Sequence, residues 1–124
     1  MRRLLLLMML LVGCQENEAD APELLTKPAQ QIGATSVVME AEIRGVGPIR
    51  PIKYGFLWDI QGNDLTLASA PNKNITGTTS SPQPYSIKVE TLLPATTYFY
   101  RSFAANNDFT RIYYGAVVSF TTLP

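Results

Sequence analysis

The sequence predicts an all-β protein, an antiparallel β-sandwich of about seven strands, and three observations lead to this class. From about residue 24 onward the apolar side chains recur at every second position, which is the period of a half-buried strand. Clusters of glycine, proline and asparagine separate these segments at the spacing typical of sandwiches. No segment of this part has the period of an amphipathic helix. The chain has 124 residues, which suits one such domain rather than two.

The amino-acid composition excludes most enzyme chemistry. There is no histidine, there is a single cysteine, and ten basic side chains balance ten acidic ones. Without histidine the chain cannot assemble a Ser-His or Cys-His nucleophile, nor a metal site built from cysteine and histidine. We therefore expect a protein that is not an enzyme and that holds no metal and no cofactor. The near-neutral charge also argues against nucleic-acid binding, because that function needs a basic surface.

The first thirteen residues predict a secretion signal. Met1-Arg2-Arg3 brings positive charge, and an apolar run of nine residues follows from Leu4 to Val12. A helix that spans a membrane needs about 20 apolar residues, whereas a charged start and a short apolar run are typical of a signal peptide. The run ends at Leu11-Val12-Gly13-Cys14, which resembles the lipobox of bacterial lipoproteins. The resemblance implies cleavage before Cys14 and acylation of its thiol; the alternative is an ordinary signal peptide with a cysteine there by chance.

Residues 14–23 predict a flexible acidic tether, because Gln15-Glu16-Asn17-Glu18 and the residues after it include no large apolar side chain. The lipoprotein resemblance implies membrane anchoring in the bacterial envelope. In Gram-negative sorting, glutamine rather than aspartate after the lipidated cysteine favours the outer membrane. The acidic run also resembles surface-export signals of some lipoproteins, and a plain solvated tether is the equal alternative.

The folded part is predicted to extend over residues 24–124, with five long strands that each direct a row of side chains inward. Shorter strands are expected at 24–31 and 65–68, and residues 69–84 are expected to form a long loop with at most a short edge strand around 74–76. The inward rows are Val37, Met39, Ala41 and Ile43; Ile52, Tyr54, Phe56 and Trp58; Tyr85, Ile87 and Val89; Tyr98, Tyr100, Ser102 and Ala104; and Ala116, Val118 and Phe120.

The segment Leu92-Leu93-Pro94-Ala95-Thr96-Thr97-Tyr98 has the pattern Leu-x-Pro-x-Thr-x-Tyr at the start of a strand. This resembles the fibronectin type III domain, an immunoglobulin-like sandwich, and residues 100–106 and 114–122 resemble its last two strands. The resemblance implies that Tyr98 is a tyrosine corner, whose hydroxyl bonds the backbone a few residues upstream. Animal domains place a core tryptophan on the second strand, where this chain has Met39; Trp58 falls on the third, which leaves the sub-type open.

The loop from Asn106 to Tyr113 is the candidate binding site. Phe109, Arg111 and Tyr113 are residue types enriched at recognition hot spots. Phe103, on the outward face of the preceding strand, is expected to extend an aromatic surface suited to a glycan or a protein. The alternative is that these rings cover the end of the sandwich or a sheet face.

Two acidic groupings are interpreted as structural. The segment from Asp59 to Asp64 lacks the ligand spacing of a calcium loop, so we interpret it as a hairpin turn. Glu40 and Glu42 share one strand face, and nothing in the sequence builds the cleft that paired catalytic carboxylates need.

The sequence thus predicts a non-catalytic, membrane-anchored binding, adhesion or spacer module at the bacterial envelope. Two alternatives stay open. The first is an accessory glycan-binding subunit or small hydrolase of a polysaccharide-degrading system, and the second is a structural lipoprotein of an envelope complex.

Overall fold

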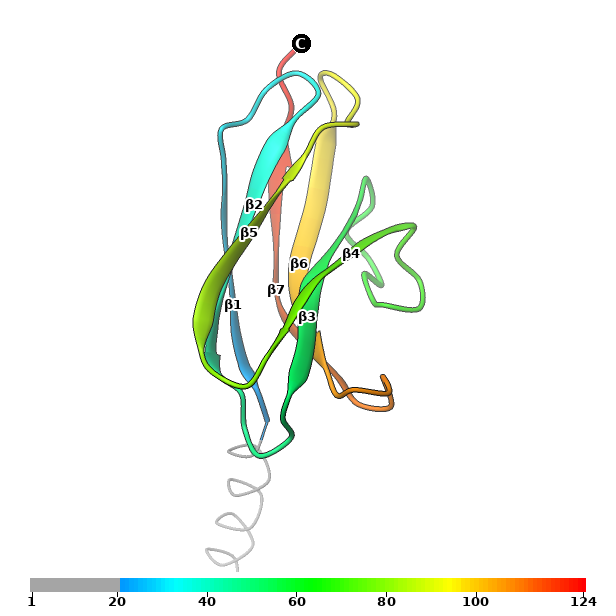
Figure 1. The fold of residues 1–124 in the computed structure, drawn as a ribbon. Helices are drawn as coiled ribbons and strands as arrows, with labels where there is room; N and C mark the ends of the chain where they lie inside the picture. The colour runs from blue at the N-terminus through cyan, green and yellow to red at the C-terminus, as the bar shows by residue number, and fades with distance from the viewer. Residues whose placement is uncertain (1–20) are drawn as a thin grey trace, which may run out of the picture.

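The computed structural model describes residues 21–124 (Figure 1). The predicted signal peptide, Cys14 and most of the tether lie outside the described residues. Among the described residues no helix is long and apolar enough to cross a membrane. The strands are β1 (Glu23–Gln30), β2 (Val37–Gly45), β3 (Ile52–Asp59), β4 (Asn72–Thr79), β5 (Gln83–Val89), β6 (Thr97–Ala105) and β7 (Ile112–Thr121).

These strands form two antiparallel sheets packed face to face. One sheet has three strands in the order β1-β2-β5, and the other has four in the order β4-β3-β6-β7. The predicted all-β sandwich of about seven strands is confirmed. β1 begins one residue before the predicted start of the domain.

The core lies between the sheets and is built from the predicted inward rows. Along β2, every second side chain from Val37 to Ile43 is at most 1% exposed. The inward rows of β3 and β6 are buried too, although Trp58 at the end of its row is only half-buried, and parts of the outer sides of these two strands are buried as well. Met39 is fully buried in the middle of β2 and fills part of the core against the opposite sheet.

The predicted inward position of Ala116 is wrong. In the β6–β7 ladder Arg101 pairs with Val117, whereas Phe103 pairs with Tyr114. Two residues of β7, Gly115 and Ala116, therefore stand opposite one residue of β6, which is a β-bulge. The extra residue reverses the alternation along β7, so that Gly115 is buried and Ala116 is exposed.

The prediction of a long loop over residues 69–84 is also wrong. Eight of these residues form β4, which pairs along its whole length with β3. Most side chains of β4 are exposed on both sides, so the strand carries no apolar alternation. The short strand expected at 65–68 does not form, and these residues lie in a turn.

Several buried tyrosines direct their hydroxyl groups to main-chain partners. The hydroxyl of Tyr98 accepts a hydrogen bond from the backbone N–H of Leu93, five residues upstream, at 2.9 Å, as the tyrosine-corner resemblance implies. The Tyr98 ring is 6% exposed and stacks on Phe120. Tyr85 donates its hydroxyl hydrogen to the carbonyl of Gly55 on the opposite sheet. These bonds allow polar rings to occupy an apolar core.

Replacing Tyr98 with phenylalanine is expected to lower the free energy of unfolding by about 1–3 kcal/mol, because the Leu93 N–H would lose its partner in a half-buried place. Chemical denaturation followed by far-ultraviolet circular dichroism measures this loss. Tyr113→Phe is the matched control, since it removes the same hydroxyl group from a half-buried tyrosine that takes part in none of the main-chain hydrogen bonds described above. Equal stability of the two variants would contradict a structural role for the Tyr98 hydroxyl.

Burial also controls the ionisation of two core tyrosines. Burial raises the pKa of Tyr100 to about 12, and it raises the pKa of Tyr85 further still. In the unfolded chain both phenols ionise near pH ~10. The neutral phenols therefore stabilise the fold fully below pH ~10, and that stability is lost as the pH rises through the folded-state values.

We expect the free energy of unfolding to fall as the pH rises from about 10 to about 12. The near-ultraviolet absorbance of phenolate and the circular dichroism should then report ionisation of these two rings together with unfolding. Tyr100→Phe removes one ionisable group, so its stability should fall less steeply with pH. Complete phenolate formation near pH ~10 with the sheets intact would contradict this prediction.

Candidate functional site

The connecting loops gather at two poles of the sandwich (Figure 1). Loops 46–51, 80–82 and 106–111 lie at the pole where β1 begins, here called the N-terminal pole. Loops 31–36 and 90–96 lie at the opposite pole with the C-terminus, where main-chain hydrogen bonds from Leu123 to Gly33 and from Ala95 to Leu123 join them. Loop 60–71 turns back along the four-stranded sheet. The predicted binding loop is therefore at the pole where β1 begins.

The predicted binding loop is a tight turn organised by Asn106. The Asn106 side-chain oxygen accepts the backbone N–H of Arg111 at 2.9 Å, and its amide nitrogen donates to the Thr110 hydroxyl at 2.7 Å. Asp108 accepts hydrogen bonds from Thr110, and these bonds lower the pKa of the Asp108 carboxyl group. Phe109 has a φ of 60°, the left-handed conformation that such a tight turn requires.

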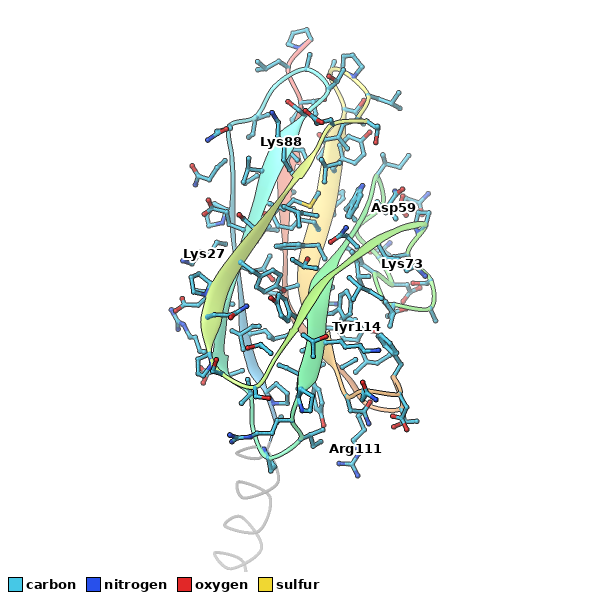
Figure 2. All side chains as sticks on the ribbon, in the orientation of Figure 1. Lys27, Asp59, Lys73, Lys88, Arg111 and Tyr114 are labelled. Atoms are coloured by element: carbon cyan, nitrogen blue, oxygen red, sulfur yellow. The ribbon has the colours of Figure 1, made fainter. Side chains whose placement is uncertain are left out.

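The three residues that the sequence singled out in this loop do not form one surface. The Phe109 ring packs on the outer side of the four-stranded sheet, where the Lys53 ammonium lies 5.0 Å from its centroid. Tyr113 pairs with Ala104 and shares its inward-facing side of the sheet. Arg111 is exposed and extends away from the body of the domain (Figure 2). The Phe109 ring thus serves packing, Tyr113 lies on the other side of the sheet, and Arg111 is free for a contact.

The prediction that Phe103 extends an exposed aromatic surface is wrong, because Phe103 is completely buried. Its side chain does point to the outer side of the sheet, but loop 60–71 covers it. Leu65 and Ala70 of this loop form a second apolar cluster with Leu57 and Phe103. The loop is apolar at these positions because it closes over an apolar sheet face.

Polar contacts also hold loop 60–71 against the sheet. Arg101 donates to the carbonyl of Leu65 at 3.1 Å and lies over the Tyr114 ring at 4.8 Å. The Tyr114 hydroxyl accepts the backbone N–H of Leu67 at 2.9 Å. Burial lowers the pKa of the Arg101 guanidinium, which is the direction expected when a cation loses water. The chain itself therefore covers the outer face of the four-stranded sheet around Phe103 and Arg101.

Truncating Phe103 to alanine is expected to cost about 3–5 kcal/mol of stability, as for other fully buried phenylalanines. Phe109→Ala should cost less, because the Phe109 ring is half-buried. Arg111→Ala is the control and should change stability by no more than about 0.5 kcal/mol. Thermal melts of the three variants measure the order of their stabilities. A Phe103 variant as stable as the Arg111 variant would contradict the burial of Phe103 beneath loop 60–71.

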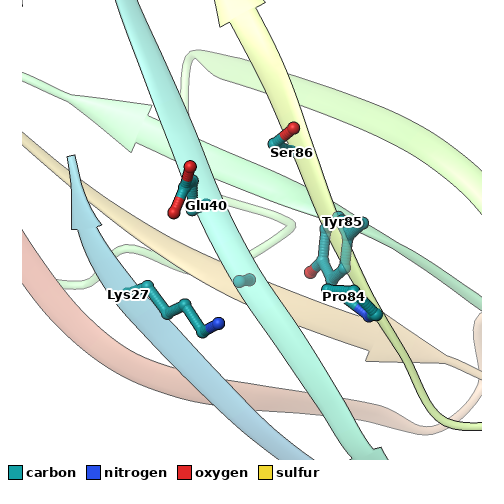
Figure 3. Close-up of a pocket in the computed structure, with 6 residues that line it drawn as sticks. Lys27, Glu40, Pro84, Tyr85 and Ser86 are labelled. Atoms are coloured by element: carbon teal, nitrogen blue, oxygen red, sulfur yellow. The ribbon is translucent and has the colours of Figure 1, made fainter. Parts of the chain in front are cut away.

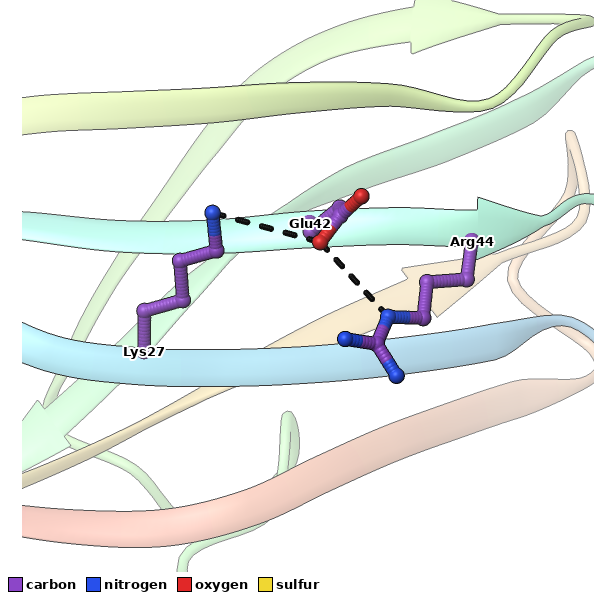
Figure 4. A network of polar contacts seen from close by, with 3 residues as sticks. All are labelled: Lys27, Glu42 and Arg44. Atoms are coloured by element: carbon purple, nitrogen blue, oxygen red, sulfur yellow. Dashed lines mark ion pairs between the residues drawn. The ribbon is translucent and has the colours of Figure 1, made fainter.

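The outer face of the three-stranded sheet is open by comparison, and it carries alternating charges. Glu42 lies between two cations, with its Oε1 atom 3.9 Å from Lys27 Nζ and 3.5 Å from Arg44 Nε (Figure 4). Beside this group is a hollow of about 240 Å³, lined by Lys27, Glu40, Ala41, Pro84, Tyr85 and Ser86 (Figure 3).

The described residues offer no evident catalytic centre. Glu42 is engaged with two cations, and no group of three or more acidic, cysteine or histidine side chains within residues 21–124 is placed to hold a metal ion. The segment from Asp59 to Asp64 leads out of β3, and the Asp59 carboxylate accepts the backbone N–H of Ile60. Asp64 takes a φ of 54° in the turn that follows.

The fold as a whole is similar to several solved structures. The sequence matches no protein-family model and no curated protein. The structure is similar to the sensor domain of the anti-sigma factor RsgI4 of Pseudobacteroides cellulosolvens, with a TM-score of 0.59 and 20% identity over 82% of this chain and 94% of that one. It is also similar to a fibronectin type III domain of human fibronectin type III domain containing protein 3, with a TM-score of 0.55 and 17% identity over 84% and 85% of the two chains. The fold is fibronectin type III-like.

A computationally redesigned β-sandwich protein is similar at a TM-score of 0.54 and 25% identity over 83% of this chain and 94% of that one. Because such different sequences share the frame, the fibronectin type III-like sandwich does not by itself specify a function. The function has to come from the surfaces that this chain leaves open. Sequence reasoning missed the row formed by Lys27, Glu40 and Ser86 across β1, β2 and β5, because this row is visible only once the strand register is known.

Proposed function

We propose that the protein is a non-catalytic binding module that a lipidated Cys14 holds at the surface of a bacterial membrane. The lipobox-like Leu11-Val12-Gly13-Cys14 carries the anchoring part of the proposal. A single acyl chain gives only marginal membrane binding, so the two or three chains of bacterial lipoproteins would be needed for a stable anchor. The outer membrane is the proposed location, since Gln15 follows the cysteine.

The place where β1 begins indicates which pole of such a module lies nearer the membrane. The nine residue steps from Cys14 to Glu23 extend at most about 30 Å. The N-terminal pole, with the loop that carries Arg111, is thereby held near the membrane. Surfaces on the side of the sandwich and at the opposite pole are free to meet a ligand. Similarity to the sensor domain of an anti-sigma factor supports a role in binding or sensing, and the open face of the three-stranded sheet is the surface that we assign to it.

Changing Cys14 to serine is expected to abolish palmitate labelling, because the hydroxyl cannot replace the thiol that forms the thioether. The protein should then accumulate as uncleaved precursor or leave the membrane fraction. Gln15→Asp is the matched control: it should keep the label and shift the protein from the outer to the inner membrane. Labelling of the serine variant at the normal level would overturn the lipoprotein proposal.

A structural lipoprotein of an envelope complex is the second candidate, favoured by the exposed apolar side chains of Ile32, Leu93 and Leu123 at the pole opposite the tether. A cluster of this kind suits a protein contact. Purification of the anchored protein in mild detergent distinguishes the two candidates, since a stable complex that is lost in Leu93→Asp would favour the structural role.

A further inference from the structure

We propose that the hollow on the outer face of the three-stranded sheet binds a neutral sugar unit of a glycan. This inference rests on the proposed function and gives the binding module a site and a ligand class. The site consists of Lys27, Glu40, Pro84 and Ser86 around a floor formed by Ala41 and Tyr85 (Figure 3).

Strand register brings three different polar groups into one row. Lys27 on β1 pairs with Glu40 on β2, and Glu40 pairs in turn with Ser86 on β5. Neighbouring strands lie about 4.8 Å apart, so an ammonium, a carboxylate and a hydroxyl follow one another across the sheet. Ala41 and Tyr85 are the next pair along the strands and direct their side chains to the core. Their backbone forms the floor, and the Pro84 ring stands at its far side.

The charges of the row favour a neutral ligand. Lys27 and Glu40 contribute one positive and one negative charge, so an anion or a cation gains from one group and is repelled by the other. The Glu40 carboxylate only accepts hydrogen bonds, the Lys27 ammonium only donates, and the Ser86 hydroxyl does both. Sugar hydroxyls match this mixture because each of them can donate and accept.

The size and the apolar parts of the site agree with one sugar ring. The hollow of about 240 Å³ is below the ~300–1,000 Å³ range of pockets for larger ligands. The Pro84 ring and the methylene stem of Lys27 offer apolar surface to the C–H face of a sugar. A chain of sugars could continue across the sheet in either direction, because this face is not covered by a loop.

Lys27 is held in place before a ligand arrives. The Lys27 ammonium contacts Glu42, and the Tyr100 hydroxyl donates to the main-chain carbonyl of Lys27 from below. Glu40 makes no ion pair among the described residues, so its carboxylate is free for a ligand. Groups that are already oriented lose less entropy on binding.

The test titrates the detergent-solubilised full chain with cellohexaose, laminarihexaose and chitohexaose by calorimetry, with glycine as a zwitterionic probe and inorganic phosphate as an anionic probe, both called charged probes here. At least one oligosaccharide should bind more tightly than either charged probe. Glu40→Gln should weaken that binding about tenfold or more, because a charged acceptor is replaced by a neutral amide that forms weaker hydrogen bonds. Ser86→Ala should weaken it less, and Glu90→Gln, an exposed glutamate in the next loop, should leave it unchanged.

All three substitutions are on the surface, and equal melting temperatures would show that the variants fold. Absence of binding by every oligosaccharide, tighter binding of glycine or phosphate, or binding that Glu40→Gln leaves unchanged would each overturn the proposal. Membrane anchoring through Cys14 is measured separately by labelling. Absence of sugar binding by a chain that still captures a protein partner would keep the binding module and remove only this site.

Discussion

The sandwich depends on a core that contains several tyrosines, whose hydroxyl groups need hydrogen-bond partners within the protein because water does not reach them. Rings from both sheets contact one another in series, from the Tyr54–Tyr85 pair at 4.5 Å to the Tyr98–Phe120 stack at 5.7 Å. A buried hydroxyl without a hydrogen-bond partner destabilises the fold. The segments that supply the partners therefore have to lie where their main chain can form a hydrogen bond with a tyrosine hydroxyl. This requirement fixes the position of β1 over β6 and the corner before β6 more closely than apolar burial alone would. The hydroxyl bonds that do so are Tyr85–Gly55, Tyr100–Lys27 and Tyr98–Leu93.

Much of the fold could be predicted from the sequence, because a half-buried strand carries its own signal. The alternation from Val37 to Ile43 identified β2 correctly, and the segment ending at Tyr98 identified the start of β6. β4 could not be found in this way, since its pairing with β3 decides its structure and its side chains are exposed on both sides. The inversion at Ala116 follows from a bulge, which depends on the neighbouring strand rather than on the local sequence.

The candidate site was harder to predict, because exposure depends on segments far apart in the chain. Alternation correctly placed Phe103 on the outer side of its strand, but only the structure shows that loop 60–71 covers it. Leu57 and Leu65 were a usable signal, since apolar residues on an outward position and in a nearby loop suggest that the two pack together. The row of Lys27, Glu40 and Ser86 spans three strands, and no local pattern could have joined these residues.

The two ends of the described chain lie at opposite poles, with β1 and β7 running in the same direction side by side (Figure 1). A tension applied between the two ends of the described chain would therefore act along the strands. The hydrogen bonds between β1 and β2 would be loaded together in shear, rather than opened one after another from an end. The close approach of Thr26 to Ser102, which share a buried hydrogen bond of 2.9 Å, would add resistance where β1 meets the opposite sheet. A domain with this strand arrangement should resist tension along its long axis better than tension that peels one strand from its neighbour.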